Sequence, residues 1–343
     1  MTINYQDRTI CITPRSLGLG GPASFQTRLI EALARKNVRV SFDPEDNSNS
    51  VILVIGGTRR IGQLSSAKRK GVRIVQRLNG MNWIHRKKNT GLRHYLRAEV
   101  NNYILSSIRK LSDAVIYQSE FSRDWWHRKY RDVGADESVI YNGVDLQQFS
   151  PSGGTTPPND INRILLVEGH LGGGYEQGLF SGMQLVKLLN QRMPKPVELL
   201  VVGDVPAEIR VQAETISTNV VWRGIVKREE IPAIDRSAHL FYSSDINAAC
   251  PNSVIEALAC GLPVIGFDTG ALPELVPPSA GRIAKYGGDV WNLDKPNIYA
   301  LADGAQAVLS DIENFRLGAR EFAEEHFDID RITDQYLKVL FPE

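Results

Sequence analysis

The chain has 343 residues, with 42% hydrophobic and 23% charged residues and a net charge of +1, values typical of a globular protein large enough for two domains. No apolar run approaches the about 20 residues that span a bilayer, and the first eight residues lack the apolar core of a signal peptide. The three cysteines are widely separated, with no metal or disulfide spacing. We therefore expect a cytoplasmic protein without a metal.

The two halves of the chain carry opposite charge. Residues 1–150 hold 24 Lys and Arg against 13 Asp and Glu, and the remainder holds 16 against 26. A basic half suggests an anionic partner, such as lipid headgroups, a phosphorylated acceptor or nucleic acid. Attraction between the two halves is the alternative explanation.

The first half alternates apolar runs with a helical pattern, which indicates a parallel doubly wound sheet. The predicted helix covers about residues 23–36. The predicted strands are residues 8–13, 38–42, 51–55, 71–78 and 114–118.

A glycine-rich loop follows the first predicted strand. Gly18, Gly20 and Ala23 fit the loose dinucleotide fingerprint, and Asp43 follows at roughly the ~20 residues that it requires. Residues 13–17 lengthen the connection, whereas the fingerprint needs a tight turn. Glycines in such a loop let a ligand approach the backbone amides, so an NAD-binding oxidoreductase stays open as an alternative.

The densest basic region covers residues 83–103, where Trp and Tyr alternate with Lys and Arg. This composition suits a membrane interface, and it also suits nucleic acid or a plain solvated helix face. Residues 139–145 read as the end of the first domain. Residues 150–158, rich in Gly, Ser, Thr and Pro, are predicted to be a linker.

The second half repeats the alternation. We predict strands at residues 163–168, 197–202, 220–227, 240–242 and 262–267, and helices at about 179–190, 231–238 and 328–340.

The stretch from Ser243 to Val276 is the most informative part of the chain. A polar loop after a buried strand leads to a helix that starts near Asn252 or Ser253 and stops at Gly261. Ser253 and Glu256 have the spacing of a capping box, so Glu256 could serve only the helix end. A strand end beside a helix N-terminus also forms an anion site.

Residues 251–264 (PNSVIEALACGLPV) resemble the donor-binding segment of glycosyltransferase family 4, the retaining GT-B enzymes. Residues 117–122 and 141–149 are also close to that family. Its two glutamates are separated by seven residues. Here Glu256 occupies the second position and Ala248 the first. The family's arginine and lysine, which hold the diphosphate, are replaced by His170 and by residues 175–177.

The resemblance implies a set of site residues. In the first half, Asn79 takes the place of a family histidine near the sugar, and His85 follows six residues later; both are candidate catalytic residues. The implied donor-binding residues are Gly20, Gly21, His170, Gly172, Gly173, Arg223, Lys227, Asn247, Cys250, Asn252, Ser253 and Glu256.

The resemblance also implies a GT-B fold, with two Rossmann-like doubly wound domains facing across a cleft. We expect an acceptor-side domain at residues 1–150, a donor domain at 151–325 and a final helix at 326–343 that crosses back to the first domain. The expected reaction is retaining transfer from a UDP- or GDP-linked sugar to a glycan or glycolipid acceptor, in polysaccharide biosynthesis, without a cofactor. Nucleic acid is not expected as a partner, whereas peripheral contact with an anionic membrane, at the inner membrane face, is one interpretation. A GT-B protein that binds without transferring also stays open, as does a nucleotide-sugar epimerase.

Overall fold

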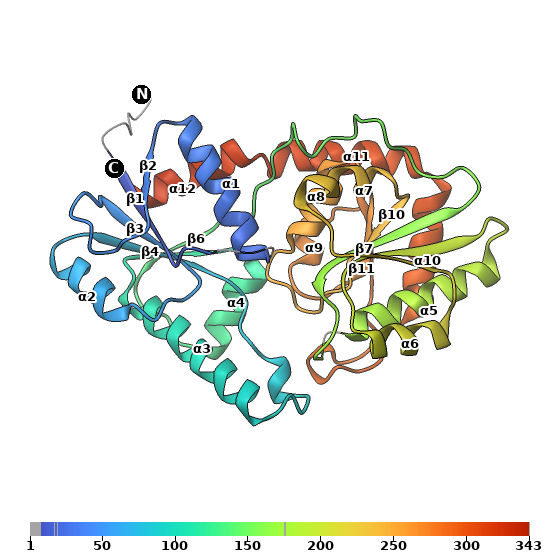
Figure 1. Cartoon of the computed structure of the whole chain (residues 1–343), viewed down its shortest axis with the longest axis horizontal. Helices are drawn as coiled ribbons and strands as arrows, with labels where there is room; N and C mark the ends of the chain where they lie inside the picture. The colour runs from blue at the N-terminus through green and yellow to red at the C-terminus, as the bar shows by residue number, and fades with distance from the viewer. Residues whose placement is uncertain (1–7, 17, 19, 175, 343) are drawn as a thin grey trace. The chain divides into compact units, whose positions relative to one another are not determined.

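The computed structural model describes residues 8–16, 18, 20–174 and 176–342. The chain divides into two compact units, one formed by Met1–Gly143 with Ile329–Glu343 and the other by Val144–Asp328 (Figure 1). The sequence analysis placed these divisions near residues 150 and 325.

The first unit is built on a six-stranded parallel sheet with the strand order β2-β1-β3-β4-β5-β6. Three of these strands, β1, β3 and β5, are buried along their whole length, which explains why they read as continuous apolar runs. The strands are β1 (Thr9–Thr13), β2 (Arg39–Ser41), β3 (Val51–Ile55), β4 (Arg73–Leu78), β5 (Ala114–Tyr117) and β6 (Asp136–Val139). The last strand ends where the sequence analysis began one, because residues 140–145 are not part of the sheet.

Helices complete the first unit. They are α1 (Gly21–Arg35), α2 (Ile61–Arg69), the short η1 (Ile84–Arg86), α3 (Leu92–Leu111), α4 (Glu120–Lys129) and α12 (Ile329–Leu340). The final helix, α12, packs against α1: the rings of Phe25 and Tyr336 lie 5.4 Å apart, and Arg35 forms an ion pair of 2.8 Å with Asp330. The C-terminal helix is therefore part of the first unit (Figure 1).

The second unit repeats this plan, with a parallel sheet in the order β12-β11-β10-β7-β8-β9. Its strands are β7 (Asn162–His170), β8 (Val197–Asp204), β9 (Val220–Gly224), β10 (Leu240–Tyr242), β11 (Val264–Phe267) and β12 (Gly281–Ala284). Its helices are α5 (Glu176–Arg192), α6 (Ala207–Ile216), η2 (Arg228–Glu230), α7 (Ile231–Arg236), α8 (Asn252–Ala259), α9 (Leu272–Leu275), η3 (Val290–Asn292), α10 (Ile298–Ser310) and α11 (Ile312–His326).

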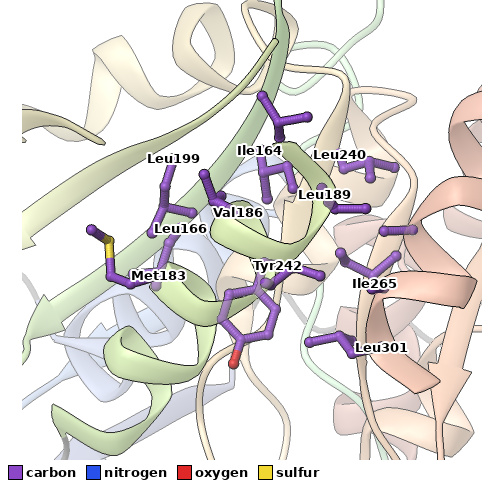
Figure 2. Close-up of a cluster of buried hydrophobic side chains, with 14 of the residues drawn as sticks. Ile164, Leu166, Met183, Val186, Leu189, Leu199, Leu240, Tyr242, Ile265 and Leu301 are labelled. Atoms are coloured by element: carbon purple, nitrogen blue, oxygen red, sulfur yellow. The ribbon is translucent and has the colours of Figure 1, made fainter. Parts of the chain in front are cut away.

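The core of the second unit lies between its sheet and α5 and α10. Leu166 of β7, Leu240 of β10 and Ile265 of β11 are fully buried against Met183 of α5 and Leu301 of α10, as Figure 2 shows. This core supports the strand ends from which the candidate site is built.

The predicted linker at residues 150–158 is not a free connection. Arg236 donates a hydrogen bond of 3.0 Å to the carbonyl of Ser150, and Pro151 lies against Gly261. The segment packs on the second unit, so its Gly- and Pro-rich composition gave the wrong interpretation. None of the helices in the described part of the chain combines the length and apolarity needed to cross a membrane.

Arg320 on α11 holds three backbone segments of the second unit together. Its guanidinium donates to the carbonyls of Ala259 at 2.6 Å, Phe149 at 2.8 Å and Leu146 at 3.2 Å. Ala259 is the last residue of α8, where carbonyls lack partners within the helix. Arg320 therefore satisfies the C-terminus of α8 and fixes this helix in place.

We predict that Arg320→Ala lowers the free energy of unfolding of the second unit by about 3 kcal/mol, because it leaves several carbonyls without a charged donor. Denaturant unfolding of the full chain would measure the loss. Arg192→Ala is the control, because Arg192 pairs with the exposed Asp303 and such pairs contribute less than about 1 kcal/mol. Equal losses in the two variants would contradict the role given to Arg320.

Candidate functional site

The candidate site lies where β7 and β10 end. These neighbouring strands pair in parallel, with Ile164 beside Leu240 and Leu165 beside Phe241. Their carboxyl ends therefore meet at one edge of the sheet, which is the edge where open α/β sheets bind ligands. The loop after β10 leads directly into α8, so the site combines two strand ends with a helix N-terminus.

Helix α8 begins one residue earlier than a capping box would require. Its N-cap is Pro251, so Ser253 is the second residue of the helix and Glu256 the fifth. The predicted capping box is wrong, because Ser253 is inside the helix and Glu256 lies beyond the first turn. Pro251 offers no side-chain acceptor to the first-turn amides. The N-terminus of α8 is thus not closed by its own N-cap side chain, and Glu256 does not serve as part of that cap.

Glu256 is a buried carboxylate, 8% exposed. Behind it lies a second buried acid, Asp235 on α7, which the sequence analysis did not single out. Burial raises the pKa of Asp235 well above its usual range, and the nearby charge of Glu256 raises it further. A neutral Asp235 does not repel Glu256, so the single charge of the pair belongs to Glu256.

Asn247 presents an amide without a partner. Its side chain is 5% exposed, and its Nδ2 group has no hydrogen-bond acceptor among the described residues. The residue also has a left-handed backbone, with φ of 58°, a conformation that asparagine tolerates better than most residues. A buried donor without an acceptor costs about 1–3 kcal/mol. A ligand oxygen at this position would recover that energy.

The next residue, Ala248, is held rigidly. The amide of Ala271 donates to its carbonyl at 2.9 Å. Gly270 lies so close that a Cβ there would be 2.6 Å from the backbone nitrogen and oxygen of Ala248, and φ of Gly270 is +61°. Only glycine fits both constraints. The loop that carries Asn247 therefore has a fixed position relative to α9.

Two carboxylates meet beside this loop, at the ends of β7 and β10. The Oγ of Ser244 donates to Oε1 of Glu168 at 3.1 Å. Burial raises the pKa of Glu168 to about 8, and the charge of Asp245 adds to that increase. Burial also raises the pKa of Asp245 to about 6. The pair therefore retains a proton near neutral pH.

A small pocket adjoins the pair, under the N-terminus of α5. The Oη of Tyr242 donates to the carbonyl of Gly178 at 3.1 Å and fixes the helix to β10. The pocket is lined by Gln177, Gly178, Ser181, Tyr242, Ser243, Ser244, Asp245, Ile246, Phe267, Thr269, Tyr286 and Pro296. Five of these residues, 242–246, belong to β10 and the loop after it.

The glycine-rich loop after β7 is occupied by its own acids. The carboxylate of Glu176 accepts from the amide of Gly174 at 2.7 Å. His170, expected to supply a cation, has its Nδ1 2.8 Å from Oδ2 of Asp204. Gly172 lies against His170 and Pro206, and Gly173 has a left-handed backbone. The loop forms a tight turn in which carboxylates already take part.

The remaining candidates of the second unit are spread across it. Arg223 is on the edge strand β9, three places from β10 in the sheet, and its guanidinium lies 3.7 Å from Glu230. Lys227 is exposed, just before η2. Cys250 is buried next to Pro251, whereas Asn252 opens α8 and is partly buried. The structure thus brings together the 247–256 residues, and it places Arg223 and Lys227 at the opposite edge of the sheet.

In the first unit, Asn79 belongs to a polar network. Its Oδ1 accepts from Arg77 at 3.0 Å and from Gln118 at 2.6 Å. Its carbonyl accepts from the indole of Trp126 at 2.9 Å. Asn142, in turn, accepts from Arg77. These contacts fix the end of β4 but use the side-chain oxygen of Asn79 fully.

His85 is buried, and its Nε2 lies 2.8 Å from Oε1 of Glu99. Its ring also contacts Tyr95 edge-on, at 5.1 Å between centroids. These contacts favour a structural role in holding η1 to α3 over the catalytic role. Gly20 is the exposed N-cap of α1, and a Cβ there would meet nothing within 4 Å. Gly21 is the first residue of that helix.

No group of three or more metal-ligating side chains converges within the described residues.

We predict that Glu168→Gln changes how stability depends on pH. Between about pH 4.5 and 8 the folded protein keeps a proton on Glu168 that the unfolded chain releases, so the free energy of unfolding falls as pH rises. The glutamine variant lacks this term and should gain stability relative to the wild type as pH increases from 5 to 8. Unfolding at several pH values would measure it.

Glu229→Gln, at an exposed position, is the control and should show a pH-independent difference from the wild type. A Glu168→Gln difference that stays constant over the same range would contradict the raised pKa.

Comparison with known proteins assigns these elements to a family fold. Residues 163–311 match the family model described as "Glycosyl transferases group 1". Two curated relatives belong to phosphatidylinositol N-acetylglucosaminyltransferase: one is the gpi3 subunit from Schizosaccharomyces pombe, and the other is the corresponding protein from Homo sapiens. Both are 22% identical to this chain, over 192 and 188 residues. The matched regions cover 55% and 54% of this chain but only 39% and 36% of the relatives.

Solved structures match over the whole chain. Sucrose-phosphate synthase from Thermosynechococcus elongatus has a TM-score of 0.71 and 16% identity, covering 97% of this chain and 98% of that one. HepE of Anabaena, in complex with UDP and glucose, has a TM-score of 0.68 and 17% identity, covering 97% and 99%. With these matches, the two parallel six-stranded sheets are those of the GT-B fold, as the sequence predicted. The chain has the GT-B fold of glycosyltransferases, and its second unit carries the match to the group 1 glycosyl transferases.

Proposed function

We propose that the protein transfers a sugar from a nucleotide-sugar donor to a hydroxyl acceptor, with retention of the anomeric configuration. The observation that carries the proposal is the match of residues 163–311 to the group 1 glycosyl transferases. That region contains α8 with the buried Glu256, the loop of Asn247 and the Glu168–Asp245 pair. Donor recognition is thus assigned to the second unit.

Glu256 binds the ribose. A charged carboxylate can accept two hydrogen bonds from neighbouring hydroxyl groups, and Asp235 beside it stays neutral. The first-turn amides of α8, together with Nδ2 of Asn247, donate to the diphosphate or to the sugar oxygens. These donors supply part of the stabilisation that cations provide in other phosphate sites.

The Glu168–Asp245 pair does not carry the full double negative charge near neutral pH, because both pKa values are raised. This limits the repulsion that a bound diphosphate would meet at the ends of β7 and β10. A protonated carboxyl can also donate a hydrogen bond to a phosphate oxygen. The acids of this chain thereby become compatible with an anionic donor.

In the reaction, the bond between the anomeric carbon and the diphosphate oxygen breaks as the acceptor oxygen forms its own bond to that carbon. The acceptor proton passes to the leaving diphosphate oxygen. This route needs no protein base, which agrees with the engagement of Asn79 and His85 in structural contacts.

A uridine nucleotide is the donor base that we propose first. HepE is described as a complex with UDP and glucose, and the curated relatives are named as N-acetylglucosaminyltransferases. The acceptor class that we propose is a glycan or glycolipid.

A protein that binds the nucleotide sugar without transferring it is the second candidate. It is favoured by the contacts of the glycine-rich loop, where Glu176 holds the amide of Gly174 and Asp204 engages His170. Ala248 in place of an acid points the same way.

The test is a thermal-shift panel of UDP, GDP and their sugars, followed by an assay of UDP release. A ligand present at a hundredfold excess over its dissociation constant stabilises the protein by roughly 2.7 kcal/mol. We expect UDP to give such a shift. Glu256→Gln and Asn247→Ala should each weaken it by about tenfold or more in affinity, because each removes a hydrogen bond at the bound donor.

Glu229→Gln should leave the shift unchanged. UDP binding with release of UDP only when an acceptor is added would support transfer. Binding without release would select the second candidate, and no shift with any nucleotide would overturn both.

A further inference from the structure

Helix α3 has apolar side chains on two opposite faces. One face packs inside the first unit, where Ala98, Leu105 and Ile108 are buried, and α3 contacts β4. The other face carries Leu92, Leu96, Val100 and Tyr103, whose spacing places them within about 80° of arc around the helix. A helix that only covers a sheet needs one apolar face, so the second requires a separate explanation.

The second face is exposed. Leu92 and Tyr103 are 74% and 72% exposed, and Leu96 and Val100 are 54% and 53% exposed. Tyr95 lies at its margin, also exposed. Half of the strongly exposed large hydrophobic side chains in the described part of the chain are on this one helix. Contiguous exposed apolar side chains of this kind mark interaction surfaces.

Cations border this apolar row. Arg93 and Arg97 are exposed one position further around the helix. Residues 81–112 contain seven Lys and Arg but a single acid, Glu99. Glu99 is held by Arg86 at 2.6 and 2.7 Å, and by His85 at 2.8 Å. These hydrogen bonds, that of Arg86 first, lower the pKa of Glu99 to about 2, so its charge is locally compensated.

We infer that α3 docks the protein on an anionic lipid surface, with Leu92, Leu96, Val100 and Tyr103 entering the headgroup region. Leucine and tyrosine on one face beside Arg and Lys form the pattern of helices that lie in a membrane interface. The long stems of Arg93 and Arg97 let their guanidinium groups reach lipid phosphates while the apolar row is buried. A lipid surface offers both an apolar layer and negative charge, which this one helix matches together.

The inference does not rest on the proposed function, because its test contains no nucleotide sugar. The full chain is sedimented with vesicles of phosphatidylcholine alone, and with vesicles that contain about one third phosphatidylglycerol. The variants are Leu96→Ser with Val100→Ser, and Arg93→Gln with Arg97→Gln. Val211→Ser is the matched control, because Val211 is 65% exposed on α6 in the other unit. Thermal unfolding confirms that each variant is folded.

We expect binding to the anionic vesicles that weakens between about 0.1 M and about 0.5 M salt. The arginine double variant should lose about twentyfold in partitioning, since each cation near the surface contributes about fivefold. The Leu96–Val100 double variant should lose roughly tenfold or more, and Val211→Ser should bind like the wild type.

Absence of binding to the anionic vesicles would overturn the inference, as would binding that neither α3 variant weakens. Analytical ultracentrifugation tests the competing occupant. If the wild type self-associates, the Leu96–Val100 variant is monomeric and vesicles are not bound, the face contacts a second copy of the chain and the lipid assignment is wrong.

Discussion

The parallel pairing of β7 with β10 is the constraint on which the candidate site depends. It brings Glu168 beside Ser244 and Asp245, although these residues are more than 70 positions apart in the sequence. The N-terminus of α5 then approaches this edge closely: a Cβ on Gly178 would lie 2.3 Å from the carbonyl of Ser244. Strand pairing and helix approach together bury the two carboxylates, and burial is what raises their pKa values.

The charge of this chain is arranged differently at two scales. The second half is acidic overall, and its glycine-rich loop uses acids for its own contacts. Near α8, however, one acid of each close pair is driven toward its neutral form by burial. The site therefore carries less negative charge than the composition suggests. In the first half, the excess of cations gathers around η1 and α3, where it borders exposed apolar side chains.

The sequence predicted the strands and the fold well, because buried parallel strands are continuous apolar runs such as Val51–Ile55 and Val264–Phe267. It located α8 and its glutamate, since the segment from Pro251 to Val264 has local signals at both ends. It could not show Glu168 and Asp245 as a pair, because only the sheet brings them together. The capping box was wrong because Pro251 starts the helix one residue earlier than Ser253 requires. The two apolar faces of α3 left it without a clear amphipathic pattern, and composition alone did not show that residues 150–158 pack on the second unit.

The placement of α12 has a consequence for how the chain folds during synthesis. The second unit is one continuous segment, Val144–Asp328, whereas the first is completed only by residues that are synthesised last. Until α12 is made, the apolar side of α1 that includes Phe25, Leu29 and Leu33 lacks its cover from Tyr336 and Leu340. Domains that fold during translation usually do so from the N-terminus. In this chain the order is reversed: the second unit can close while the first still waits for the last helix.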